Sequence, residues 1–485
     1  MSDNHIEDLK ELFRHWSGEE GIEIESLPQA GSYRQYFRIY GHWRQAIGVY
    51  NPDKQENAAF LSFTRHFLQA GLPVAGIYAE NTAKDIYLLS DLGRDSLFDL
   101  LESDQSTERP SETLRGLYRD TVALLPQFQI VAGSGIDYSA CYPVQDFDSR
   151  SMHWDLNYFK YFFLKLLRIP FDEYALEKDF ETLSGYLLEA DSKYFMYRDF
   201  QARNIMISEG KPYFIDYQGG RRGPLQYDLA SLLFQVKANL PFSFREEMLH
   251  WYIENVNRYT TIAEKDFIEK YNAFVLIRLL QVMGAYGFRG YYERRAHFLQ
   301  SIPFAVDNVR WFLDNIHLKP ATPALNATLE YIARLNISSP SFAQNQSLTV
   351  NINSFSFKNA PPPDYSGNGG GFVFDCRALP NPGRWEHYRH LTGRDTAVIQ
   401  FLEREPAIEK FMQNVFKLID QSVLEYQRRG FRNLQVNFGC TGGQHRSVYC
   451  ADRLARYLEE RYSLNIELIH TQLEPTGKYR APGEE

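Results

Sequence analysis

Over the first hundred residues, hydrophobic and polar positions alternate in a way that predicts short strands after an N-terminal helix. The segments 32–41 and 44–50 read as consecutive strands joined by a tight turn. Residues 56–71 repeat their apolar positions with helical spacing and end at a glycine, which is typical of a helix C-cap. Residues 85–93 read as a further strand that runs into a polar turn.

From residue 109 to residue 320 the pattern becomes mostly helical. The segment 153–169 is strongly apolar but interrupted by polar residues, so we expect a buried helix and not a membrane span. Residues 194–220 differ, because they read as strand, polar loop, strand, turn and strand. A strand-rich small lobe, followed by a helical large lobe with an embedded hairpin, is typical of a kinase-like layout.

A proline-containing polar stretch, SSPSFAQNQS, predicts a linker at 339–346. Strands and helices alternate beyond it, which indicates a compact α/β unit over 347–485. The expected elements are strands at 347–357 and 434–440, a buried strand at 372–379, helices over 396–429 and 446–462, and a closing strand at 466–473.

Composition narrows the class of protein. At roughly 150 residues per domain, 485 residues suggest two or three domain-sized units. Apolar residues make up 44% and charged residues 23%, as in globular proteins that are not disordered. The start of the chain is acidic and amphipathic, so we expect no signal peptide and no membrane anchor. The four cysteines form no CxxC pair, so we expect neither a zinc site nor a disulfide framework, as in a reducing cytoplasm.

The net charge of −9 is unevenly distributed. Residues 347–485 carry 17 Lys and Arg against 16 Asp and Glu, while the preceding 346 residues carry 35 against 45. Neither part is basic enough to predict bulk binding of nucleic acid.

Three polar residues in the hairpin region have the spacing that phosphoryl transfer needs. The reaction requires a carboxylate to orient and deprotonate the acceptor hydroxyl, and ligands that hold Mg²⁺ on the phosphates. Asp199, followed five residues later by Asn204, supplies a base and an amide ligand from one loop. Asp216 supplies a carboxylate one short hairpin further on. The alternative is that Asp199 and Asn204 only cap turns.

These motifs resemble the aminoglycoside-phosphotransferase-type kinases. Within that superfamily, residues 1–338 most resemble bacterial kinases that phosphorylate N-acetylmuramate and N-acetylglucosamine at the anomeric hydroxyl in cell-wall recycling. The resemblance implies a small lobe at about 1–93 and a large lobe at about 94–338. The matching positions are Arg198, Asp199, Arg203 and Asn204 in the loop, Asp216 as metal ligand, Asp228 in YDLASLL as support for the loop, and WDLNYF at 154–159, which we interpret as core packing.

The nucleotide side of the resemblance is incomplete. The turn around Gly31 and Ser32 resembles the turn that covers the phosphates, and LLSDLG, which contains Asp91, resembles the hinge whose backbone binds adenine. The third strand has no Lys to hold the phosphates. The candidate replacements are Arg34, Arg38 and Lys54.

A second candidate site is the Gly-rich sequence between a strand and a helix at 436–458. Successive backbone N–H groups at a helix N-terminus bind anions, and Arg446 can add a guanidinium. The spacing from Cys440 to Arg446 also fits the C-x5-R loop of cysteine phosphatases, which leaves that activity open.

Residues 347–485 resemble the C-terminal domain of the RapZ-type RNase adapter family, through FDCRALPNP, LTGRD and GCTGGQHRSVY. The resemblance implies binding of glucosamine-6-phosphate by Thr441, Gly442, Gly443, His445, Arg446 and Ser447, with Asp375, Arg377 and Asn381 as further contributors. The adapter's GxxxxGK(S/T) loop is missing and the tail at 476–485 has two basic residues, so we do not expect RNA binding.

The sequence therefore predicts an α+β bilobal protein-kinase-like domain followed by a smaller α/β domain. The expected activity is ATP- and Mg²⁺-dependent phosphorylation of an N-acetylated amino sugar in the cytoplasm. An amino-sugar phosphate at the C-terminal domain would regulate it. The alternatives are a non-catalytic pseudokinase that senses a metabolite, and a Cys440 phosphatase. The oligomeric state stays open.

Overall fold

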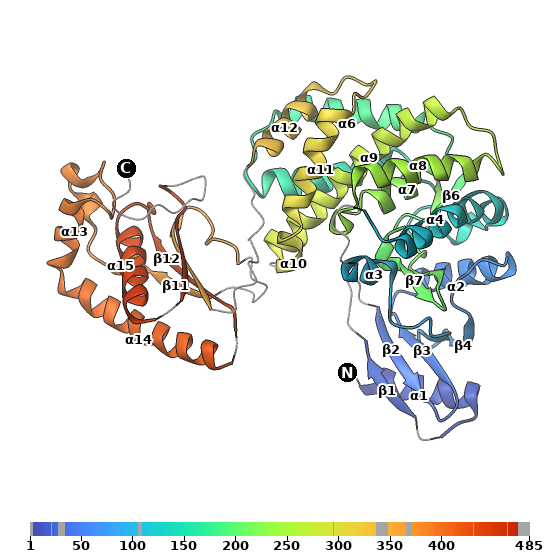
Figure 1. The fold of residues 1–485 in the computed structure, drawn as a ribbon, viewed down its shortest axis with the longest axis horizontal. Coiled ribbons are helices and arrows are strands. Elements are labelled where there is room, and N and C mark those ends of the chain that lie inside the picture. Colours follow the sequence, from blue (N-terminus) through green and yellow to red (C-terminus); the bar gives the residue numbers. More distant parts are fainter. Residues whose placement is uncertain are drawn as a thin grey trace. The chain divides into compact units, whose positions relative to one another are not determined.

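The computed structural model describes residues 3–20, 22–27, 34–104, 109–293, 295–335, 348–364, 371–429, 431–462 and 464–473. The chain forms two compact units, one from residues 1–285 with 304–334 and one from 286–303 with 335–485 (Figure 1). The predicted linker at 339–346, Gly31, Ser32 and the tail at 476–485 lie outside the described residues.

The first unit begins with a five-stranded antiparallel sheet in the order β1-β2-β3-β5-β4. Its strands are β1 (Glu23–Ser26), β2 (Gln35–Tyr40), β3 (Gln45–Tyr50), β4 (Ile77–Asn81) and β5 (Ile86–Leu89). Helix α1 (Asp3–Ser17) buries Leu9 and Phe13 against Ile39 and Leu88 of this sheet (Figure 1). The strands and the helices expected here from the hydrophobic pattern are confirmed.

Helix α2 (Lys54–Gln69) is fixed at its first turn by Asp53, whose carboxylate accepts the backbone N–H groups of Gln55 and Glu56, both at 3.0 Å. Gly71 follows the helix with φ +72°, a conformation that L side chains adopt at a cost. The cap places Glu56 on the first turn of the helix.

The large lobe is mainly helical and contains two short antiparallel pairs of strands. Strand β6 (Tyr194–Met196) pairs with β9 (Arg221–Gly223), and β7 (Ile205–Ser208) pairs with β8 (Lys211–Phe214), both antiparallel. The helices are α3 (Leu97–Ser103), α4 (Glu112–Pro126), α5 (Ser149–Phe159), α6 (Glu173–Leu188), α7 (Leu225–Leu233), α8 (Phe242–Val256), α9 (Glu264–Tyr286), α11 (Ile302–Asn315) and α12 (Pro323–Arg334). The second unit includes α10 (Ala296–Leu299).

The apolar segment 153–169 is helical, but the expectation of one fully buried helix is wrong. Helix α5 ends at Phe159 and continues as one π-helical turn, Lys160–Lys165. Phe159 and Phe163 are buried, whereas Tyr161 and Leu166 are exposed. The π turn changes which side chains face the core, so one apolar stretch meets both core and solvent.

The C-terminal unit contains a four-stranded parallel sheet in the order β11-β12-β10-β13. Its strands are β10 (Thr349–Ser356), β11 (Phe372–Asp375), β12 (Asn433–Cys440) and β13 (Asn465–His470). Ser356 pairs with Cys440 at the carboxyl ends of the two central strands. Ligands of open parallel sheets bind at this edge.

Helices α13 (Thr396–Glu403), α14 (Pro406–Arg428) and α15 (Arg446–Arg461) complete this unit. Val350, Val436, Ile419 and Leu454, from two strands and two of these helices, share one apolar core. The expected strand at 372–379 exists in part, but it is not buried: β11 is an edge strand, Val373 is 49% exposed, and the chain turns into a 3-10 helix at Cys376.

Among the helices that the structure describes, none is long and apolar enough to cross a membrane.

Candidate active site and anion-binding loop

The loop between β6 and β7 is held by a buried carboxylate on α7. Asp228 accepts the backbone N–H groups of Tyr197 at 2.8 Å and Arg198 at 2.9 Å, and the side-chain amide of Gln129 at 2.9 Å. Arg198 and Asp216 both have positive φ, at 78° and 69°. Non-glycine residues adopt this backbone at a cost that the surrounding structure must offset, and such residues cluster at functional sites.

One amide joins the three residues expected to carry the chemistry. The Nδ2 of Asn204 donates to the backbone carbonyl of Asp199 at 2.8 Å and to Oδ2 of Asp216 at 3.1 Å. The side chain of Gln218 donates to the other carboxylate oxygen of Asp216 at 2.7 Å. The structure thus brings Asp199, Asn204 and Asp216 together at the open end of the β7–β8 hairpin.

The donor set in this cluster suits a hard divalent cation. Burial, and then the negative charge of Asp199, raise the pKa of Asp216. A cation beside Asp216 would relieve both effects, and carboxylate and amide oxygens are the ligands that Mg²⁺ takes. Within the described ranges no three His, Cys, Asp or Glu side chains cluster as a cage. That fits a cation held by one or two protein oxygens together with substrate phosphates.

Arg198 and Arg203 occupy different environments. The Arg198 guanidinium pairs with Asp155 of α5 at 2.7 Å and lies over the rings of Phe147 and Tyr227, 5.2 and 5.1 Å from their centroids. Arg203 is exposed, and its charge acts on Asp216. Arg198 therefore anchors the catalytic loop to the large lobe, while Arg203 faces solvent.

The segment 154–159 is more than core packing. Leu156 and Phe159 are buried as expected, but Trp154 is 48% exposed and Asp155 forms the ion pair with Arg198. The interpretation as plain core was wrong for these two positions. The signal that could have found Asp155 was its place in the segment that resembles the kinases.

On the nucleotide side, the three candidate cations have different surroundings. Lys54 is 70% exposed and 4.0 Å from Asp85. Arg38 donates to both carboxylate oxygens of Asp91, at 2.6 and 3.1 Å, and to the carbonyl of Gly93 at 2.7 Å. Arg38 and the Asp91 side chain therefore brace this segment through their bonds to each other and to Gly93.

Arg34, immediately before β2, is the cation that faces the Asp216 cluster. It is 2% exposed, lies 3.4 Å from Glu56, and its guanidinium carbon is 5.4 Å from the centroid of the Phe60 ring. Asn51 donates to the other oxygen of Glu56 at 2.7 Å. The charge of Arg34 also lowers the pKa of Asp216, against the effect of burial. Sequence reasoning missed Glu56, because it lies in a helix with no motif of its own.

The C-terminal loop begins at a thiol surrounded by donors. The Sγ of Cys440 accepts the N–H of Gly443 at 3.2 Å and lies 3.1 Å from the Ser447 hydroxyl. Burial alone would raise the pKa of Cys440, but the hydrogen bonds from Ser447 and Gly443 and the charge of Arg446 lower it below its usual value.

Only one of the two adjacent glycines in this loop is required by the backbone. Gly443 has φ +68°, and a Cβ there would lie 2.9 Å from the backbone N of Ser356. A Cβ at Gly442 would meet nothing within 4 Å. The loop thus passes close to the end of β10 at Gly443, where only glycine fits.

The remaining side chains predicted to bind an anion mostly hold the loop in place. Arg446 is buried and donates through one nitrogen to the carbonyls of Arg377 and Leu379, at 2.8 and 2.9 Å. His445 lies 2.9 Å from the carbonyl of Tyr388. Asp375 pairs with Arg377 at 2.7 Å, Asn381 caps the turn at Gly383, and Thr441 and Gly442 are exposed.

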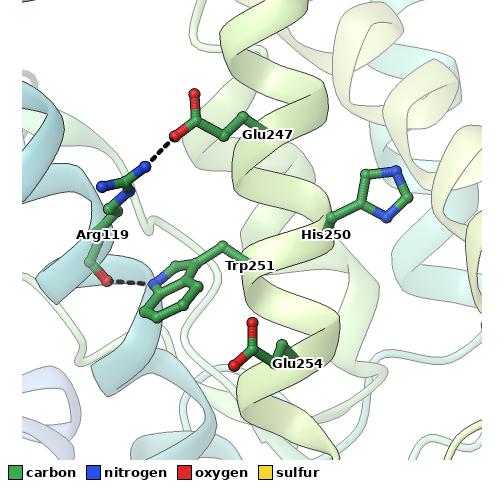
Figure 2. A pocket seen from close by; sticks show the side chains of 5 residues that line it. All are labelled: Arg119, Glu247, His250, Trp251 and Glu254. Atoms are coloured by element: carbon green, nitrogen blue, oxygen red, sulfur yellow. Dashed lines mark hydrogen bonds and ion pairs between the residues drawn. The ribbon is translucent and has the colours of Figure 1, made fainter.

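A pocket of about 430 Å³ lies elsewhere in the first unit, between α4 and α8. Figure 2 shows Arg119 joined to Glu247, and the indole of Trp251 donating to the carbonyl of Arg119, at 2.7 and 3.0 Å. His250 and Glu254 complete the lining. None of the residues predicted to form a site lines this pocket.

The fold and the loop cluster define a bilobal kinase-like domain joined to a small parallel α/β domain. Residues 23–264 match the model of the phosphotransferase enzyme family, and residues 348–474 match the RapZ C-terminal domain. The chain thus contains a domain of the phosphotransferase enzyme family at residues 23–264 and a RapZ C-terminal domain at residues 348–474.

The curated relatives are proteins called nucleotide-binding proteins. One from Thermotoga sp. is 36% identical over 180 residues, which span 36% of this chain and 62% of the relative. One from Cupriavidus taiwanensis is 40% identical over 132 residues, 27% of this chain and 43% of the relative. The chain thus spans less than two thirds of the length of these relatives.

Solved structures similar to the chain include a choline kinase and a choline/ethanolamine kinase family protein. The choline kinase LicA from Streptococcus pneumoniae gives a TM-score of 0.41 at 15% identity, covering 64% of this chain and all of that one (100%). A choline/ethanolamine kinase family protein from Mesorhizobium loti gives 0.43 at 13% identity, covering 68% and 98%. At this low sequence identity and TM-score, the two solved structures add nothing to the family match.

Proposed function

We propose that the chain is an ATP-dependent sugar kinase that phosphorylates an N-acetylated amino sugar, N-acetylmuramate or N-acetylglucosamine, at the anomeric hydroxyl. The observation that carries the proposal is the amide of Asn204, which ties the backbone of Asp199 to the Asp216 carboxylate. The family match supports a phosphotransferase. The amino sugar and the anomeric position come from the resemblance of the loop motifs.

In this proposal each residue of the cluster has one task. Asp199 orients the sugar hydroxyl and takes its proton as the oxygen attacks the terminal phosphate of ATP. Asn204 and Asp216 are the residues that would hold Mg²⁺, which neutralises charge on the phosphates. Arg34 supplies a protein cation on the same side. Asp228 keeps the loop in position through the N–H groups of Tyr197 and Arg198.

We also propose that the C-terminal domain binds an amino-sugar phosphate such as glucosamine-6-phosphate and thereby regulates the kinase. The support is the loop at the carboxyl ends of β10 and β12, where Gly443 must be glycine and a helix begins at Arg446. In this proposal the protein acts in cell-wall recycling in the cytoplasm, where its four cysteines would stay free, as they are in the structure. RNA is not a partner in this proposal.

A second candidate function for this domain is a Cys440 phosphatase. The lowered pKa of the Cys440 thiol favours it, because the thiolate is the nucleophile in such enzymes. The position of Arg446 disfavours it, since a nitrogen of that guanidinium is bound to two backbone carbonyls.

The test of the kinase is ATP turnover by the full chain with a panel of amino sugars, followed by identification of the product by phosphorus NMR. We expect ADP release that depends on an N-acetylated amino sugar, and a sugar 1-phosphate as product. Absence of sugar-dependent ADP release across the panel would contradict the proposal and favour a pseudokinase. The same assay, with and without glucosamine-6-phosphate, tests regulation, because coupled sites must alter each other.

A further inference from the structure

Arg221 is a buried cation beside the catalytic loop. It opens strand β9 opposite Met196, the last residue of β6, and the loop with Asp199 follows β6 directly. The residue is only 6% exposed. Its Nε donates to the carbonyl of Gly219 at 3.1 Å, which fixes the plane of the guanidinium.

This cation has no carboxylate partner among the residues that the structure describes. The nearby Asp155 is bound to Arg198 at 2.7 Å, and the next residue, Arg222, pairs with Asp146 at 3.5 Å. Burial, and then the positive charge of Arg198, lower the pKa of Arg221. A buried charge is costly unless an opposite charge pairs with it, so an anionic group on a substrate would stabilise this guanidinium.

The anion belongs on the acceptor side of the cluster. The carboxylates that act on Arg221 are Asp155 and Asp199, the proposed base. Gly219, which receives the Arg221 hydrogen bond, adjoins that base, because a Cβ there would lie 3.9 Å from Oδ2 of Asp199. On the nucleotide side, the cations that act on Asp216 are Arg34 and Arg203. The basic groups that act on Asp216 are thus different residues from Arg221, which adjoins Asp199 through Gly219.

We propose that Arg221 forms a subsite for a carboxylate on the sugar substrate, so that the kinase prefers an acidic amino sugar to a neutral one. The inference rests on the proposed kinase function and adds a substrate class to it. A guanidinium pairs with a carboxylate through two parallel hydrogen bonds, which gives direction as well as charge. An anchored carboxylate also orients the sugar hydroxyl toward Asp199.

The test compares two probes on the full chain: N-acetylmuramate, which carries a carboxylate, and N-acetylglucosamine, which does not. Steady-state kinetics are measured for the wild type, Arg221→Gln, Arg221→Lys and the matched control Arg222→Gln. We expect Arg221→Gln to lower kcat/KM for N-acetylmuramate by about 10- to 100-fold, the loss of one charge-assisted contact. The value for N-acetylglucosamine and the KM for ATP should stay within about threefold, and Arg221→Lys should recover part of the loss.

Three results would overturn the inference. Equal losses for both sugars would make Arg221 a structural residue, and a raised KM for ATP would make its anion a phosphate of the nucleotide. A similar selective loss in Arg222→Gln would remove the assignment to position 221. If the wild type turns over neither sugar, the proposed function fails, and calorimetry with the same two sugars then decides the subsite. Weaker binding of N-acetylmuramate alone in Arg221→Gln supports it, and equal binding by both proteins refutes it.

Discussion

The guanidinium of Arg34 lies 3.4 Å from the carboxylate of Glu56, across the gap between the start of β2 and the first turn of α2. Ordinary kinases pair a lysine on the third strand with a helix glutamate to hold the phosphates. Here β3 has no lysine. In the proposed kinase, Arg34 would supply that cation from a position 11 to 16 residues earlier in the chain, immediately before β2 begins.

Replacing Arg34 with Met should weaken ATP binding. Loss of a charge-assisted hydrogen bond corresponds to a rise in the KM for ATP of about 10- to 100-fold. Lys54→Met is the matched control, because Lys54 is exposed and its ion pair is with Asp85 and not with Glu56, and it should leave the KM for ATP unchanged. The measurement is steady-state kinetics at saturating sugar. Similar effects of the two substitutions would exclude Arg34 as the phosphate-binding cation.

Asp199→Asn should abolish most of the sugar-dependent ATP consumption. General-base catalysis contributes about 10²- to 10⁴-fold, so kcat should fall by that factor. The fold should persist, because the link to Asn204 uses the Asp199 backbone carbonyl and not its side chain. Thermal melting and nucleotide affinity are the controls. Near-normal turnover in this variant would remove Asp199 from the mechanism.

Asp216→Ala should act on nucleotide binding as well as on the chemistry. The substitution removes the carboxylate that Asn204 and Gln218 hold in place. Calorimetry with ATP in the presence of Mg²⁺ should show weaker binding, and the dependence of binding on Mg²⁺ should shrink. Unchanged affinity would contradict the assignment of Asp216 as the metal ligand.

The kcat should fall as the pH drops through about 6, and this acidic limb of the pH profile should report on Asp228. Burial raises the pKa of this carboxyl to about 6. Above that pH the carboxylate accepts the N–H groups of Tyr197 and Arg198, and below it protonation takes away part of that capacity. The limb is not acid unfolding: a folded-state pKa above the unfolded value of about 3.9 means that this group favours the folded state as pH falls from 6 to 4.

The measurement for this prediction is kcat against pH, with circular dichroism at each pH. Asp228→Asn, which cannot ionise, should have low activity and no limb near pH 6. A wild-type limb that coincides with loss of helical signal, or that persists in Asp228→Asn, would assign it to another group.

Cys440→Ser should leave sugar-phosphate binding intact. A serine hydroxyl can accept the N–H of Gly443 and bond to Ser447 as the thiol does, so the loop should keep its shape. Calorimetry with glucosamine-6-phosphate on the full chain measures binding, and a chromogenic phosphate ester measures hydrolysis. Phosphatase activity in the wild type that disappears in Cys440→Ser would establish the second candidate function in place of pure binding.

Most of the small lobe and the parallel sheet could be predicted, because their hydrophobic periodicity is local. The helix at 56–71 and the strand at 434–440 match α2 and β12 within two residues at each end. The sequence did not show that the strand within 372–379 is an exposed edge strand, since the order of strands in a sheet decides which strand lies at the edge. The π turn after α5 could not be predicted either, because a change in the winding of a helix does not alter the hydrophobic pattern of a short apolar run.

The candidate site was predictable where a motif carries it and not where tertiary contacts complete it. Asp199, Asn204 and Asp216 stand in recognisable spacing, and the structure brings them together. Arg221 carries no motif, and its proposed role depends on its tertiary surroundings, where the structure records a hydrogen bond to the Gly219 carbonyl and no ion pair among the described residues. In the C-terminal loop, the sequence suggested that Arg446 faces a ligand, whereas the fold uses that guanidinium to fasten two carbonyls.

The amide of Asn204 has a consequence for how the two substrates bind. In the proposed kinase, one NH₂ group joins the carboxylate that would hold the metal to the backbone that carries the proposed base. A nucleotide that orders this amide would therefore also order the backbone that positions the sugar. By linkage, whatever factor the nucleotide adds to the affinity for the sugar, the sugar adds to the affinity for the nucleotide. Because either substrate would order the same amide, we expect the two substrates to bind with positive synergy and not independently.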